Sequence, residues 1–167
     1  MISKTYVQTM ARYNDWQNSW SVEAAGALSD LQRRDDRGAF FKSIHGTFNH
    51  VLWADRRWQL RFHGKPPEPT PIADSAALIE NWYEFVDARK ACDTQITNWA
   101  ASITDAWLND STTWKPLGAT ETFVQPHALL VTHFFNHQTH HRGQIHCMLT
   151  QYGVATPPTD LPWMPAA

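Results

Sequence analysis

The sequence has little glycine, little cysteine, no long apolar run and no large excess of charge of either sign. Its 167 residues include seven glycines and two cysteines, and the formal net charge at pH 7 is −2. Because nucleic-acid-binding proteins usually carry a basic face, this balance argues against a nucleic-acid partner. No apolar stretch approaches the roughly 20 residues of a transmembrane helix, so we expect no membrane association.

The two cysteines, Cys92 and Cys147, lie far apart, and neither belongs to a CxxC pair. We therefore expect free thiols in a reducing compartment, which predicts a cytoplasmic protein. The first residues also lack the apolar segment of a secretory signal. A chain of this length is expected to form a single domain over residues 1–167, with one sizeable core.

Apolar side chains recur at helical spacing over most of the chain, and this pattern predicts four long helices. A loop with four prolines, residues 64–71, is long enough to cross over to a helix that is not adjacent. The expected helices run from Lys4 to Leu28, from Asp36 or Gly38 to Gly64, from a cap at Asp74 or Ser75 to between Ile103 and Trp107, and from Pro126 to Tyr152-Gly153.

The segment before the last helix lacks the helical pattern. Residues 112–114 and 121–124 are rich in threonine and aromatic residues and flank PLGA, which predicts a small β-hairpin. In the proline-rich tail, we expect Leu161, Trp163 and Met164 to pack on the bundle. The fold class is therefore all-α, a four-helix bundle with a long crossover loop and a small hairpin before the last helix.

Four histidines within nine residues mark the last expected helix. His133, His137 and His141 are spaced by four and share one helical face, whereas His140 lies about 100° away from His141. Imidazole is the commonest metal ligand in proteins, and a pair at i, i+4 can hold one ion. His137 and His141 are the best candidate pair.

A third ligand must come from another helix, because two imidazoles alone make a weak site. His45 and His50 are five residues apart, about 140° around the helix, so they cannot both face one ion. We favour His50, since its apolar neighbours indicate a buried segment. A triad of His50, His137 and His141 would leave positions on a metal open for water or substrate.

The alternative to a metal site is a hydrogen-bonded network in which these imidazoles satisfy each other and Asn136 or Gln144. Gln144 could otherwise support the site by holding a water or a substrate group. Asp55 could accept a hydrogen bond from the ring N–H of a ligand histidine, a partner that ligating imidazoles normally have. An ion pair with Arg56, Arg57 or Arg89 is the commoner role for such an aspartate.

Three arginines of the second expected helix, Arg56, Arg57 and Arg61, form a basic strip. An anionic substrate or a thiol cofactor could use this strip. A solvated face whose charges pair with Asp and Glu is the commoner interpretation.

Three sequence motifs resemble those of the DinB/YfiT-like metalloenzyme superfamily. Residues 137–144, HQTHHRGQ, resemble its HxxxHRGQ motif. Residues 45–58, HGTFNHVLWADRRW, resemble its second-helix motif, in which the last histidine of FNH is the first ligand. Residues 13–18, YNDWQN, resemble its first-helix motif. The resemblance therefore spans nearly the whole chain.

The resemblance implies a divalent metal ion, usually zinc or nickel, bound by His50, His137 and His141, and in many relatives a homodimer. Some relatives are thiol-dependent S-transferases or a maleylpyruvate isomerase that use low-molecular-weight thiols. We therefore expect a metal-dependent enzyme that acts on a small molecule by thiol transfer or hydrolysis, with the metal as Lewis acid. The alternative is a non-catalytic module that binds a metal or a ligand.

Overall fold

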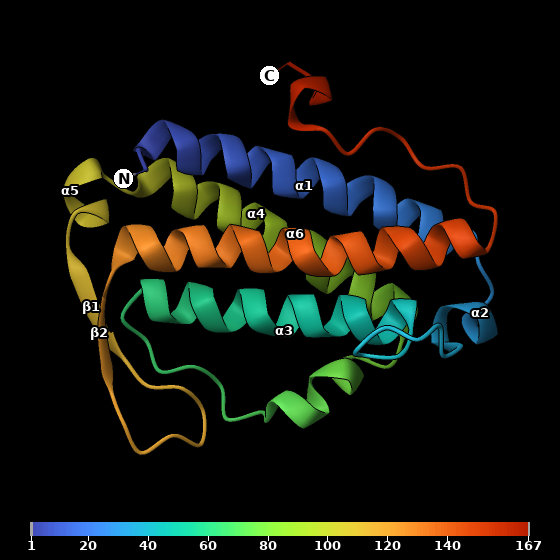
Figure 1. The fold of residues 1–167 in the computed structure, drawn as a ribbon, viewed down its shortest axis with the longest axis horizontal. Helices are drawn as coiled ribbons and strands as arrows, with labels where there is room; N and C mark the ends of the chain where they lie inside the picture. Colours follow the sequence, from blue (N-terminus) through green and yellow to red (C-terminus); the bar gives the residue numbers. More distant parts are fainter. Residues whose placement is uncertain (1, 167) are drawn as a thin grey trace.

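The computed structural model describes residues 2–166, and four long helices form the body of the molecule (Figure 1). The bundle contains α1, α3, α4 and α6, and α6 packs against both α1 and α3. The expected all-α bundle with a hairpin before its last helix is confirmed. The long helices are α1 (Lys4–Gly26), α3 (Ile44–Phe62), α4 (Trp82–Ser102) and α6 (His127–Gln151).

Short elements connect the long helices. The α-helix α2 (Asp30–Arg34) follows α1, and the 3-10 helix η1 (Ile72–Ala77) lies in the crossover between α3 and α4. The helix α5 (Asp105–Leu108) follows α4, and the 3-10 helix η2 (Leu161–Trp163) lies in the tail. Of these, η1 matters most for function, because it packs along α3 beside the histidine cluster.

The helix that carries His50 begins later than the predicted Asp36 or Gly38. Its N-cap is Ser43, whose hydroxyl accepts from the backbone N–H of Gly46 at 3.0 Å. Lys42, just before it, has φ +68°, which breaks helical geometry. A Cβ on Gly46 would lie 2.5 Å from the Phe41 carbonyl oxygen, so glycine allows this turn to lie against the helix.

The third long helix also begins later than predicted, at Trp82 with Asn81 as its cap. Side chains of α3 hold the preceding backbone out of helical geometry. The Ile79 N–H donates to Asn49 Oδ1 at 3.0 Å, and the Ile79 carbonyl accepts from Asn49 Nδ2 at 3.1 Å and from His45 Nε2 at 2.8 Å. These bonds use backbone groups that a continuous helix would need for itself.

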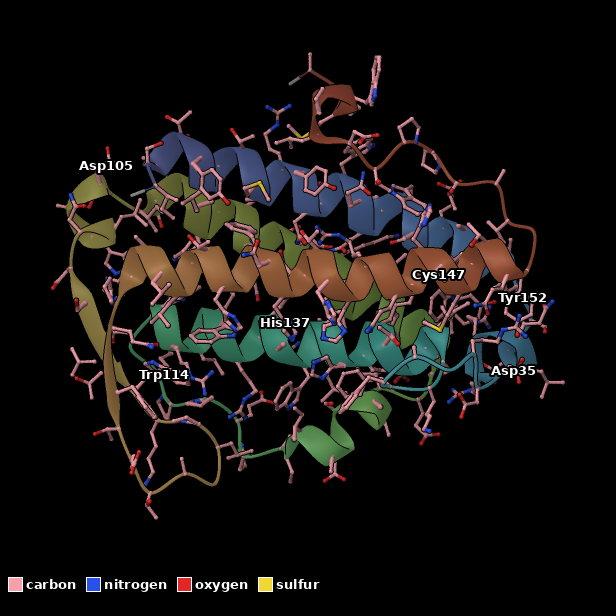
Figure 2. All side chains as sticks on the ribbon, viewed as in Figure 1. Asp35, Asp105, Trp114, His137, Cys147 and Tyr152 are labelled. Atoms are coloured by element: carbon pink, nitrogen blue, oxygen red, sulfur yellow. The ribbon has the colours of Figure 1, made fainter. Side chains whose placement is uncertain are left out.

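The predicted hairpin is confirmed, with β1 (Ser111–Trp114) antiparallel to β2 (Phe123–Pro126) and Trp114 opposite Phe123. In the tail, the expected packing is wrong for Trp163 and Leu161, which are 69% and 42% exposed, whereas Met164 is half-buried. Polar bonds hold the tail instead, including one of 2.5 Å from the Tyr13 hydroxyl to the Thr159 carbonyl. Figure 2 shows a similar polar contact, from Tyr152 to Asp35, at the end of the bundle.

Both cysteines are free thiols, as expected, with Cys92 buried and Cys147 exposed. Among the described residues, none of the helices combines the length and the apolar character needed to cross a bilayer.

Candidate metal centre

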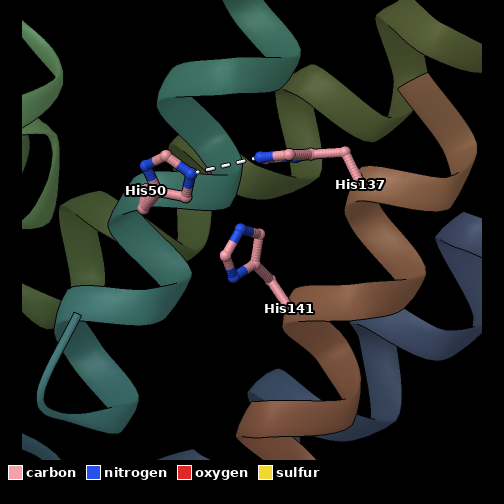
Figure 3. A group of neighbouring side chains, drawn as sticks. All are labelled: His50, His137 and His141. Atoms are coloured by element: carbon pink, nitrogen blue, oxygen red, sulfur yellow. Dashed lines mark hydrogen bonds between the residues drawn. The ribbon is translucent and has the colours of Figure 1, made fainter. Parts of the chain in front are cut away.

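Three histidines from two helices meet in the space between α3 and α6 (Figure 3). His50 extends from α3, and His137 and His141 extend from successive turns of α6. One ring nitrogen from each lies within 4.8 Å of the other two, and His50 Nε2 is 3.2 Å from His137 Nε2. Nitrogens bound to one tetrahedral zinc ion, each about 2.0–2.1 Å from it, lie roughly 3.3 Å apart. The cluster is therefore compatible with metal binding.

Ser75 fixes the tautomer of His50. The Ser75 hydroxyl donates its proton to the Ile72 carbonyl at 2.6 Å, so toward His50 Nδ1, at 2.9 Å, it can only accept. Nδ1 of His50 must then carry the proton, and Nε2 presents its lone pair to the cluster. This is the state that a metal ligand requires.

Gln144 fixes the tautomer of His141. Its side-chain oxygen lies 2.8 Å from His141 Nδ1, and an amide oxygen can only accept. The amide nitrogen of Gln144 faces His140 Nε2 at 3.3 Å, which is consistent with this orientation. Nε2 of His141 is thereby left unprotonated, so Gln144 supports the cluster through a ligand candidate.

The three imidazoles are uncharged at neutral pH, so the cluster does not repel a cation. Burial lowers the pKa of His50 to about 3, and repulsion from the other two rings adds to the effect. Burial, followed by repulsion from His141, lowers the pKa of His137 to about 3. The pKa of His141 is also lowered by burial. Only the neutral imidazole offers a lone pair to a metal.

Aromatic rings clamp His50. Phe41 stacks on it with ring centroids 3.7 Å apart, and the ring of Trp53 lies 5.5 Å from it with the two planes 28° apart. Phe41 also contacts the edge of His141 at 5.5 Å. Helical spacing could not identify Phe41 or Ser75 as site residues, because both come from segments outside the helices that carry the histidines.

The remaining histidines considered in the sequence have other contacts. His45 donates to the Ile79 carbonyl, as described above, and points away from the cluster. His133 is exposed, and its ring lies 5.3 Å from Trp58 and 5.9 Å from His137. His140 is exposed on α6.

Asp55 contacts none of the three histidines by hydrogen bond and instead joins a buried ion-pair network. Arg89 Nη1 lies 2.7 Å from Asp55 Oδ2, and Gln138 Nε2 donates to the other oxygen at 2.9 Å. Arg89 also pairs with Asp93 at 2.8 Å, and Asn18 donates to Asp93 at the same distance. Of the two roles considered for Asp55, the structure shows the commoner one, an ion pair with Arg89.

The triad borders a cavity of about 610 Å³ whose walls are mostly apolar. His50 and His137 form part of its lining, so the cluster is accessible to a ligand of small-molecule size. Tryptophans, prolines and two arginines supply most of the rest: Trp53, Trp58, Trp114, Pro69, Pro71, Pro116, Arg57 and Arg61.

Comparisons with known proteins agree with the histidine motifs. Protein DinB of Bacillus subtilis (strain 168) is 28% identical over 166 residues, covering 89% of this chain and 87% of the relative. A family model described as DinB family matches residues 1–167. That match includes α3 and α6 with all three clustered histidines, and the chain belongs to the DinB family.

Proposed function

We propose that His50, His137 and His141 bind one divalent metal ion, zinc or nickel, and that the chain is a metal-dependent enzyme acting on a small molecule. The observation that carries this proposal is the convergence of the three ring nitrogens beside a cavity. The fixed protons on His50 Nδ1 and His141 Nδ1 support it, because both rings then direct a lone pair at one point.

A bound divalent ion would supply Lewis-acid chemistry, which makes a water or a thiol a nucleophile at neutral pH. The chain itself supplies position and a dry environment. Ser75 and Gln144 hold two of the rings in one orientation, and Phe41 stacks on His50 and covers one face of its ring. The cavity holds a substrate beside the triad.

Thiol transfer to an electrophilic small molecule, or hydrolysis, is the reaction class we propose. The family resemblance supports a low-molecular-weight thiol as cosubstrate, and the cavity volume suits a small molecule. The cavity beside the triad favours an enzyme over a metal ion with a purely structural role, and the activity assay below distinguishes the enzyme from a non-catalytic ligand-binding module. The homodimer implied by the resemblance stays a prediction.

Metal analysis of the purified protein tests the site. We expect one divalent ion per chain after expression in supplemented medium, and His137→Ala should remove most of it, because two imidazoles bind much more weakly than three. His146→Ala is a matched control, since its imidazole is on the same helix but contacts Thr156 at 2.8 Å. A wild-type protein without stoichiometric metal, or a His137→Ala variant that retains it, contradicts the proposal.

Catalysis is tested separately with the metal-loaded protein. Consumption of low-molecular-weight thiols with a panel of electrophiles should depend on the metal and be lost in His137→Ala. A protein that binds metal stoichiometrically but consumes neither thiols nor hydrolysable esters and amides fits the non-catalytic module.

A further inference from the structure

One face of α3 carries a triad histidine at one end and two arginines at the other. Arg57 and Arg61 are seven and eleven residues after His50, which returns both to within about 20° of its direction. Along the helix axis they lie roughly 10 and 16 Å from His50. All three line the same cavity, so a single ligand can reach from the triad to the arginines.

Arg61 has no anionic partner among the described residues. Its guanidinium lies 4.7 Å from the ring of Trp58 and 5.1 Å from that of Trp114. Its hydrogen bond to the Lys115 carbonyl is long, at 3.5 Å. Burial lowers the pKa of Arg61 to about 10, with repulsion from Arg57 adding to it, so the charge sits in an unfavourable environment. The expectation that the arginines of this strip are solvated and paired with acidic residues is therefore wrong for Arg61.

Arg57 adds positive charge to the same wall. Its guanidinium lies 4.8 Å from the ring of Trp53 and donates to the backbone carbonyl of Glu68. Neither contact neutralises its charge, and the Glu68 carboxylate, which raises the pKa of Arg57 against the effect of burial, forms no salt bridge with it in the described part of the chain. Around these two cations the walls are apolar, which strengthens any charge pair formed between them and a ligand.

We infer that the cavity binds a substrate with a carboxylate, which pairs with Arg61, and with an apolar body that lies against Trp58 and Trp114. A guanidinium stacked on indole rings keeps its N–H edge free for a planar, bidentate partner, and carboxylate has that geometry. The other end of the substrate lies at the histidine triad. This inference rests on the proposed function for the reaction, but the carboxylate subsite can be tested without it.

The probe is 4-phenylbutyrate, with its neutral amide for comparison, titrated against intrinsic tryptophan fluorescence. We expect the wild type to bind the acid at least about 10-fold more tightly than the amide, because charge-assisted hydrogen bonds are strong. Arg61→Met should weaken acid binding by about 10- to 100-fold and leave the amide nearly unchanged. Titration in EDTA, and again with zinc, distinguishes binding of the carboxylate by Arg61 from binding of the carboxylate by the metal.

Two further variants make the result specific. Arg56→Met is the matched control, because Arg56 is on the same helix but lines a different cavity, and it should leave the preference for the acid unchanged. Arg61→Lys keeps the charge without the bidentate edge and should retain part of the preference.

Equal binding of acid and amide by the wild type overturns the inference. So does a preference that survives in Arg61→Met, or one that is present only with zinc. A wild type that binds no zinc contradicts the proposed function but leaves the acid preference in EDTA measurable. The two failures are therefore distinguishable.

Discussion

At the scale of single residues, the proton on each imidazole decides whether the cluster can accept a cation. Ser75 lies in the crossover segment, and its hydroxyl holds the proton of His50 on Nδ1. Without that acceptor, the ring can carry its proton on Nε2 and turn away from the cluster. Under the proposed function, Ser75 would contribute to metal affinity through the orientation of a ligand without touching the metal itself.

We expect Ser75→Ala to weaken zinc affinity by about 10- to 100-fold, the usual effect of losing a partner that orients a metal ligand. Competition with a chromophoric chelator measures this change. Ser102→Ala is the control, because its hydroxyl makes the same local bond, to the carbonyl three residues earlier, but contacts no histidine. Equal zinc affinity in the Ser75 variant and the wild type would show that packing by Phe41 alone orients His50.

At the scale of elements, a buried charge network joins the four long helices, since Gln138 of α6 also donates to Asp55 of α3. Arg89 on α4 is 2% exposed and pairs with Asp55 on α3 and Asp93 on its own helix. Asn14 and Asn18 of α1 donate to the same Asp93 carboxylate. Removing the arginine would leave two buried carboxylates without their cation.

We expect Arg89→Met to lower the free energy of unfolding by about 3–5 kcal/mol, measured by urea denaturation at pH 8. Arg34→Met is the control, because Arg34 pairs with exposed Asp30 on the surface and should cost less than about 1 kcal/mol. If Arg89→Met lowers the free energy of unfolding as little as the control does, the network contributes conformational specificity rather than stability.

The same variant should respond to pH. Burial raises the pKa of Asp93 to about 6 even with Arg89 opposing it, and burial also raises the pKa of Asp55. A carboxyl whose folded pKa exceeds its unfolded value binds protons first in the folded state, so folding gains stability as pH falls through the folded pKa. Without Arg89 to lower them, the pKa values of Asp55 and Asp93 rise further, so the variant gains more stability on acidification than the wild type does. The loss in Arg89→Met should therefore be smaller at pH 5 than at pH 8.

Helical spacing explains how much of these elements could be predicted. Helical spacing correctly predicted that the rings of His137 and His141 lie together. The apolar neighbours of His50 also correctly indicated that His50, and not His45, is the third ring of the cluster. The predicted starts of α3 and α4 were wrong. Both were placed too early, because Phe40, Phe41 and Ile79 extend the apolar pattern to residues before the helices. Their positions depend on long-range contacts, such as Asn49 with the backbone of Ile79, that no local pattern contains.

At the scale of the whole molecule, a core of buried apolar side chains holds the four long helices together. The core is built from side chains such as Phe48, Phe85, Phe134 and Leu149, and all four are 2% exposed or less. The helices therefore have their main stabilising contacts without a metal. A metal bound by His50, His137 and His141 would add a link between α3 and α6.

Chelation should therefore leave the protein folded but less stable, with an unchanged far-UV circular dichroism spectrum. Zinc at a thousand times its Kd should add about 4 kcal/mol, which corresponds to a rise in Tm of roughly 8–16 °C for a chain of this size. The rise should be absent in His137→Ala and present in His146→Ala, because only the first variant removes a triad ring. Unfolding on chelation at room temperature would instead mark the ion as structural and favour the non-catalytic module. An equal rise in His137→Ala would place the stabilising zinc away from the triad.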